Sequence, residues 1–292
     1  MGILFALLLA TADGAQSEYA LSLDAAADWT IARGQAAATG ARTVDVGGRF
    51  TVYLTPVIED ATPIALQPYL QRRSSVTLTV GAATIATDAD ERRVHADLAS
   101  EVYLTKWLAL AASIGYRAEV LDTTQSRRDL LFYSALAEAR LADVRLSLGI
   151  DGATLFNPAG ADPLTTLRGR AELRAVLVEH IDLAIGGSIS VPGGDGYLHI
   201  DYYRTRTLGF MSGVFGGKEQ VGFPDWGATA VLNGHEPIPG NADSFIGFLM
   251  GFSYWPDPSI GVKVYYAPAW ISNSSTGISD QRVILTLMGR AF

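Results

Sequence analysis

Apolar and polar residues alternate along most of the chain. From Tyr19 to Ile31 the odd positions are apolar or small, and the even positions include Ser22, Asp24 and Asp28. A period of two places successive side chains on opposite faces of a β-strand. The same alternation predicts strands within 44–54, 94–104, 108–120, 131–141, 144–151, 167–177, 181–191, 262–266 and 281–292, with weaker candidates at 66–84, 197–208, 222–233 and 243–254. Helical spacing is hard to find, so the pattern predicts an all-β chain.

The connections between these strands alternate in length. Very short links stand at 105–106, 142–143, 179–180 and 256–258, and longer links rich in Gly, Pro, Asp and Ser at 32–42, 121–128, 155–165, 192–196, 234–243 and 271–281. Short turns at one rim and longer loops at the other are typical of an antiparallel outer-membrane barrel. No linker separates two blocks of different composition, so we expect a single β domain.

Composition narrows the classes of function. The 292 residues are 49% hydrophobic and 18% charged, and none is Cys. This composition excludes a disordered protein, a disulfide scaffold and a Cys-based metal site. A net charge of −8 and a pI near 5.0 indicate no nucleic-acid partner. Since the chain has no His-x-x-x-His motif and no phosphate-binding loop, we expect neither a metal nor a cofactor.

The first 15 residues resemble a secretory signal peptide. Met1–Ala10 is an apolar run too short for a membrane-spanning helix, and small residues suited to cleavage follow at Ala12 and Ala15. The basic flank that normally precedes such a run is missing, so a buried first strand remains an alternative. We expect residues 1–15 to be the signal and 16–292 the barrel domain.

Alternation alone does not distinguish a barrel in lipid from a soluble β-sandwich. The polar faces mix Arg and carboxylates with Gly, Ser and Ala, which suits a crowded lumen better than a solvent-facing surface. Aromatic residues stand near strand ends, where rings favour the bilayer interface: Trp29, Trp107, Tyr254, Trp255, Tyr265, Tyr266 and Trp270. These features favour a membrane barrel, and a soluble periplasmic β protein stays open as the alternative.

Together with the terminal Phe292, these patterns resemble bacterial outer-membrane β-barrel proteins of porin-like appearance. The stretch Tyr53–Arg72 resembles a segment in uncharacterised proteins of that kind. The resemblance implies a single antiparallel transmembrane barrel in contact with outer-membrane lipid. We expect about 14 strands, or about 12 if residues 206–233 form a long loop or a plug folded into the barrel.

The last strand departs from the pattern usual in this class. Counting back from Phe292, the alternate positions are Arg290, Met288, Thr286 and Ile284, whereas Val283, Leu285 and Leu287 form the more apolar face. The sequence does not decide which of these two faces contacts lipid.

The inward faces carry the candidate site residues. One strand holds Arg168, Arg170, Glu172 and Arg174; neighbouring strands contribute Arg93, Asp97, Glu101, Arg117 and Arg145. In a water-filled pore such arginines would attract anions and set selectivity. The alternative is that arginines and carboxylates of adjacent strands neutralise each other in a hydrogen-bonded network.

These observations predict a porin-like channel for passive diffusion of small hydrophilic solutes, with a preference for anions if the arginines are unpaired. A non-conducting barrel with a structural or docking role is the alternative. An outer-membrane lipid-modifying enzyme is less favoured: His95 and His199 precede Asp97 and Asp201 by two residues, but no Gly-x-Ser-x-Gly motif accompanies them. We therefore expect no enzyme activity.

Overall fold

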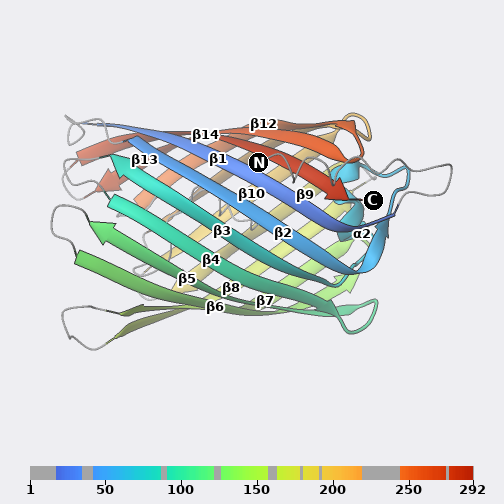
Figure 1. The fold of residues 1–292 in the computed structure, drawn as a ribbon, viewed down its shortest axis with the longest axis horizontal. Coiled ribbons are helices and arrows are strands. Elements are labelled where there is room, and N and C mark those ends of the chain that lie inside the picture. Colours follow the sequence, from blue (N-terminus) through green and yellow to red (C-terminus); the bar gives the residue numbers. More distant parts are fainter. Residues whose placement is uncertain are drawn as a thin grey trace.

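The computed structural model of the chain is a closed antiparallel barrel of fourteen strands (Figure 1). Each strand pairs with its neighbours in the sequence, and β1 closes the barrel by pairing with β14. The structure describes residues 18–34, 42–86, 91–121, 126–156, 163–177, 180–190, 193–218, 244–273 and 276–291. The predicted all-β antiparallel barrel and its larger strand count are confirmed; the proposed signal at 1–15 lies outside the described residues.

The strands are long enough to cross a bilayer when tilted, since the shortest has 10 residues and about 9–11 suffice. Their bounds are β1 (Glu18–Gly34), β2 (Arg42–Ile58), β3 (Ser75–Ala86), β4 (Glu91–Tyr103), β5 (Leu108–Leu121), β6 (Ser126–Leu141), β7 (Val144–Phe156), β8 (Leu164–Leu177), β9 (Ile181–Ser190), β10 (Gly193–Tyr203), β11 (Leu208–Lys218), β12 (Ser244–Asp257), β13 (Ile260–Asn273) and β14 (Thr276–Ala291).

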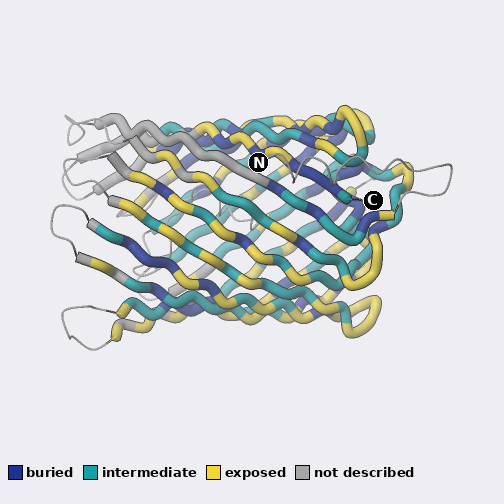
Figure 2. The backbone as a smooth tube through the Cα atoms, in the orientation of Figure 1, coloured by how far each residue is buried: buried dark blue, intermediate teal, exposed yellow. Residues whose placement is uncertain are grey.

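The outer face of the barrel is apolar. Exposed and buried positions alternate along the strands (Figure 2), and the exposed set is dominated by aliphatic and aromatic side chains such as Val94, Ile114 and Leu148. On β14 the exposed face is Val283, Leu285 and Leu287. A closed barrel with this exterior leaves no unpaired strand edge in hydrocarbon, which is what a bilayer requires.

The two rims differ, though less regularly than the sequence suggests. We call the rim where β1 begins and β14 ends the terminal rim, and the opposite one the loop rim. Short turns at the terminal rim join β4 to β5, β6 to β7, β10 to β11 and β12 to β13. The predicted long loops at 192–196 and 271–281 are wrong. The strand β10 already begins at Gly193, β13 ends at Asn273, and β14 begins at Thr276.

Tyr19, Trp255 and Tyr265 face the lumen rather than lipid, so the interfacial position expected for Trp255 and Tyr265 is wrong. Tyr265 packs with Leu249 and Ile284 inside the barrel. Tyr19 is buried because the pairing of β1 with β2 shifts register between Tyr19 and Leu21, which reverses the alternation there. Trp255 is buried against Ile64 and Met288, on the face opposite to Tyr254. Trp107, Tyr254 and Trp270 are exposed as an interfacial aromatic belt requires.

The weaker strand predictions need correction. Ile64–Leu66 and Gln67–Leu70 are helical turns, η1 and α2, so the strand expected over 66–84 begins only at Ser75. The segment 206–233, considered as loop, plug or strands, contributes β11 as a strand, and 222–233 lies outside the described residues. None of the helices in the described chain is long and apolar enough to span a membrane.

Candidate functional site

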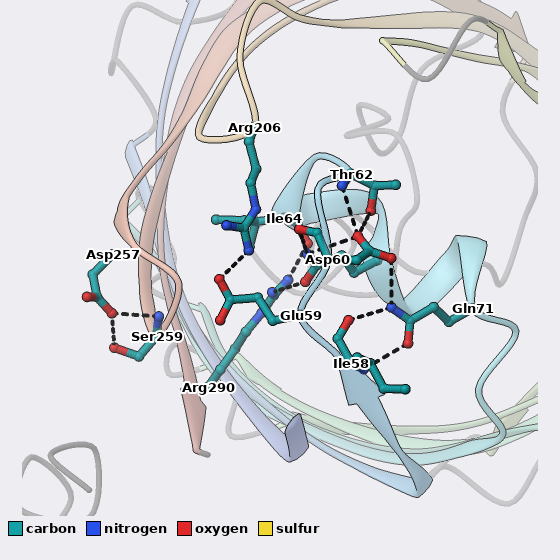
Figure 3. Close-up of polar contacts among 11 residues, drawn as sticks. Ile58, Glu59, Asp60, Thr62, Ile64, Gln71, Arg206, Asp257, Ser259 and Arg290 are labelled. Atoms are coloured by element: carbon teal, nitrogen blue, oxygen red, sulfur yellow. Dashed lines mark hydrogen bonds and ion pairs between the residues drawn. The ribbon is translucent and has the colours of Figure 1, made fainter. Parts of the chain in front are cut away.

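The connection between β2 and β3, residues 59–74, folds inside the barrel at the terminal rim (Figure 3). We call it the plug. Pro63 and Pro68 interrupt strand pairing in this segment, and η1 and α2 form instead. Its apolar side chains pack on the lumen wall, Leu66 against Val176 and Tyr203. The plug is therefore packed on apolar patches of the lumen wall.

Polar contacts fasten the first half of the plug to distant strands (Figure 3). Glu59 forms an ion pair with Arg206, and the backbone N–H of Ile64 donates to the carbonyl of Arg206 at 3.1 Å. From β14, Arg290 donates to the carbonyl oxygen of Ile64 at 2.5 Å and to Oε1 of Gln67 at 3.2 Å. The plug is thus tied to the β10–β11 turn and to the last strand.

The second half is fixed by side chains reaching back to the backbone. Gln71 accepts a hydrogen bond from Ile58 N–H at 2.8 Å and donates to the Ile58 carbonyl at 2.5 Å. Arg72, in the left-handed region at φ 54°, donates to the carbonyls of Lys106 and Ala142, each at 2.7 Å. These last bonds connect the plug to two neighbouring turns of the terminal rim.

Asp60 closes a small turn at the start of the plug. Its Oδ1 accepts hydrogen bonds from the backbone N–H of Thr62 at 2.9 Å and from the Thr62 hydroxyl. Burial alone would raise the pKa of Asp60, but the bonds from Thr62, Gln71 and Gln67 favour the ionised form and lower the pKa below its usual value.

Tyr69 of α2 is surrounded by arginines from three adjacent strands. The guanidinium carbons lie 3.9 Å (Arg140), 4.2 Å (Arg174) and 5.4 Å (Arg145) from its ring centroid. A cation over an aromatic face is attracted by the ring quadrupole. Burial raises the pKa of the Tyr69 phenol, although the nearby arginines oppose the shift.

The plug and the lumen wall line a chamber of about 570 Å³. Tyr69 and Pro68 line it from the plug, and Thr51, Thr77 and Ser113 are among the wall residues. Its charged lining is balanced, with six cations (Arg49, Arg73, Arg145, Arg170, Arg174, Lys263) and six carboxylates (Asp97, Glu101, Glu138, Glu172, Asp182, Asp201). The described chamber is therefore polar and carries no large net charge.

The arginines predicted on β8 point into the lumen beside carboxylates. Arg168 Nε lies 2.9 Å from Asp151, and its Nη1 3.5 Å from Asp195. Arg174 lies 2.5 Å from Asp182. Arg170 is farther from its carboxylate than Arg168 and Arg174 are from theirs, because its Nη2 lies 3.7 Å from Glu172.

Glu172 itself is shared. It accepts hydrogen bonds from the Tyr197 hydroxyl and from Arg145 at 2.7 Å, and Arg145 also reaches Glu138 at 3.4 Å. The arginines and carboxylates of this wall thus alternate in one network that runs over β6, β7, β8 and β10.

The other predicted residues are divided between two places. Arg93 and Arg117 both lie beside Glu119, Arg93 at 3.7 Å. Asp97 and Glu101 line the chamber on β4. Of the histidines considered for catalysis, His199 Nε2 lies 2.6 Å from Asp201, and the described residues contain no group of three or more ligands suited to a metal.

Sequence reasoning missed the plug and the residues that hold it. Tyr69 and Arg290 were not candidate site residues, and a plug was considered only at 206–233. A signal existed in Tyr53–Arg72, where Ile64, Ala65 and Leu66 are consecutive apolar residues between two prolines. Such a segment has no strand alternation, and it falls at the rim where the other links are short.

Solved structures share the fold over nearly the whole chain. The outer-membrane protein Omp33 of Acinetobacter baumannii matches with a TM-score of 0.54 and 14% identity, covering 94% of this chain and 98% of that one. The CymD monoaromatic hydrocarbon channel matches with 0.57 and 10%, covering 94% and 89%. A Pseudomonas aeruginosa FadL homologue matches with 0.55 and 9%, covering 94% and 90%.

No protein-family model matches the chain, and no curated protein is significantly similar to it in sequence. The chain has the fold of bacterial outer-membrane β-barrel proteins, and the class and the outer-membrane location predicted from the sequence are confirmed at that level. Similarity at this low identity defines the fold, so function has to be argued from the lumen.

Proposed function

We propose that this protein is an outer-membrane channel for the passive diffusion of small hydrophilic solutes. The observation that carries the proposal is the chamber, whose lining is dominated by charged and hydroxyl side chains of Arg, Lys, Asp, Glu, Thr, Ser and Tyr. Polar lining groups replace the hydration of a polar solute, whereas they would have to be desolvated to pass an apolar one.

This lining favours a different kind of solute from the hydrocarbons named for some of the structural neighbours. CymD is described as a monoaromatic hydrocarbon channel, but a chamber with six cations and six carboxylates favours a water-soluble molecule. We therefore assign hydrophilic solutes to this barrel despite the shared fold.

Selectivity between anions and cations should be weak. Arg168 and Arg174 each stand within ion-pair distance of a carboxylate, and opposite charges so close together leave little field for a passing ion. Arg170, 3.7 Å from a carboxylate that Arg145 already engages, is our candidate for the residual anion preference.

A sealed barrel with a structural or docking role is the second candidate, favoured by the plug. The plug occupies the terminal rim and is tied to the wall through Glu59, Arg72, Ile64 and Gln67. If it never moves, the chamber would be a closed end and not a passage.

The deciding experiment records single-channel conductance of refolded protein in planar bilayers, for the wild type and for a variant in which residues 60–71 are replaced by a short Gly-Ser turn. We expect discrete steps from both, with several-fold larger unit conductance in the variant. Heat-modifiable migration in gels would verify that both are folded. Inserted protein that stays silent in both forms would exclude a channel and support the sealed barrel.

A further inference from the structure

Arg140 differs from the other arginines around the plug. Arg140 is only 4% exposed, and its Nη1 donates a hydrogen bond to the Tyr103 hydroxyl at 3.1 Å. Its Nε and Nη2 are buried without a hydrogen-bond partner, and within the described chain no carboxylate forms an ion pair with it. A buried guanidinium normally has acceptors for its N–H groups, because desolvating them without partners is costly.

The Tyr69 ring, rather than a carboxylate, lies next to the Arg140 guanidinium and partly compensates its charge. Arg174 and Arg145 share that ring but also have carboxylate partners, Asp182 and Glu172. Arg140 has no carboxylate partner in the described chain; beside its bond to Tyr103 it has the ring, whose centroid is 3.9 Å from the guanidinium carbon. An aromatic face attracts a cation but accepts no strong hydrogen bond in the guanidinium plane, so the in-plane donors stay available.

The Tyr69 ring lies over the Arg140 guanidinium and helps to bury it. Tyr69, Arg145 and Arg174 line the chamber, whereas Arg140 does not. Because Tyr69 belongs to the plug, moving the plug away from β6 would open Arg140 to the chamber. The same movement would bring the in-plane N–H groups of Arg140 within reach of a solute.

We propose that Arg140 is a binding site for a small oxyanion, a carboxylate or a phosphate, and that its occupation excludes the Tyr69 ring and so favours the open plug. A guanidinium offers two parallel N–H donors to such an anion. The ligand binds only the open state, so it shifts the plug equilibrium toward opening. This inference rests on the proposed channel function for its effect on conductance, but the binding itself does not.

The first test measures binding of inorganic phosphate to the refolded full-length protein in detergent by calorimetry, at constant pH and ionic strength. We expect one site per chain in the wild type and its loss in Arg140→Gln. Tyr69→Ala should bind about tenfold more tightly if the closed plug covers the site about nine-tenths of the time. A merely structural role for Tyr69 would not raise affinity.

Arg127→Gln is the matched control, because Arg127 lies on the same strand but its side chain is 57% exposed outside the lumen. Arg140→Lys serves as a second variant that keeps the charge but loses the two-pronged donor, and we expect weak binding from it. Unchanged phosphate binding in Arg140→Gln would overturn the proposal, and so would equal loss in Arg127→Gln.

The second test adds phosphate during bilayer recording. We expect a severalfold rise in open probability for the wild type, no rise for Arg140→Gln at the same unit conductance, and constitutive opening for Tyr69→Ala. Binding without any change in a conducting channel would overturn the coupling to the plug. Binding by protein that never conducts, even without residues 60–71, would instead refute the channel function and leave the oxyanion site standing.

Discussion

The lumen face of β8 and the pocket around Tyr69 are both rich in arginine, but their charges are compensated differently. On β8, Arg168 and Arg174 lie beside carboxylates of adjacent strands, Asp151 and Asp182. Around Tyr69, Arg140 has an aromatic ring and a tyrosine hydroxyl but no carboxylate partner in the described chain. Arg168 and Arg174 are therefore compensated by strand residues, whereas the contact of Arg140 with Tyr69 depends on the plug and can be lost without breaking a strand.

This difference separates a permanent element from a movable one. The wall pairs join residues of neighbouring strands in one hydrogen-bonded register, such as Asp151 opposite Arg168. The plug is attached through side-chain hydrogen bonds, one ion pair, the backbone bond from Ile64 to Arg206 and two small apolar clusters. Elements with few buried contacts open at lower free-energy cost than the strands that carry them.

The largest expected effect is on the wall. Arg168→Ala would leave the buried carboxylate of Asp151 without its partner, and we expect a loss of about 3 kcal/mol in the free energy of unfolding. Urea titration of the protein in lipid vesicles measures it. The double variant Asp151→Ala, Arg168→Ala should recover much of the loss; a fully additive double variant would show that the pair is not coupled.

A smaller effect is expected at the plug. Arg206→Gln removes the ion pair with Glu59, which is partly exposed, so the cost should be about 1 kcal/mol or less. The loss should appear as faster hydrogen exchange at the Leu66 and Gln71 amides, with little change in global unfolding. Equal acceleration in the strands would mean that the plug does not open by itself. Glu59→Gln should reproduce the result, and the double variant Glu59→Gln, Arg206→Gln should exchange no faster than either single variant.

Arg170→Ala tests the residual selectivity of the wall. Since Arg170 is 3.7 Å from Glu172 and lines the chamber, its removal should shift the permeability ratio toward cations by less than about twofold. Reversal potential under a salt gradient measures the shift. The double variant Asp151→Ala, Arg168→Ala removes two opposite charges together and should change the ratio less; the reverse order would contradict this division of roles.

The smallest effect concerns the pH dependence of the plug. The pKa of Asp60 is lowered in the folded plug from its usual 3.8. Its ionised form therefore contributes stability that is present above that value and is lost as the pH falls through the lower, folded pKa. Wild-type conductance should rise as the pH drops from about 5 to 3, and Asp60→Asn should reduce this rise. An unchanged acid response in Asp60→Asn would assign it to other carboxylates.

Much of the barrel could be predicted because its rule is local. A period of two decides which side chains face lipid, and β14 shows that the more apolar face, with Leu285 and Leu287, is the exposed one. The prediction failed where alternation is interrupted. The register shift near Tyr19 turned that ring inward, and the helical turns at Ile64–Leu70 have no two-residue period at all.

The candidate site was only half predictable. The inward position of Arg168, Arg170 and Arg174 follows from alternation, but whether each meets a carboxylate depends on strand register, which pairs Asp151 with Arg168. The Tyr69 pocket combines one residue of a connection with arginines from β6, β7 and β8. No spacing in the sequence indicates that meeting.

The sequence by itself determined the class of object: strands with one apolar face, short turns and a polar interior, because burial against lipid imposes a pattern readable residue by residue. Only the tertiary structure decided that the connection after β2 turns into the lumen, and that Arg206 and Arg290 are there to hold it. Those contacts join residues up to 226 positions apart. They arise from closure of the barrel, which brings its first and last strands together around the plug.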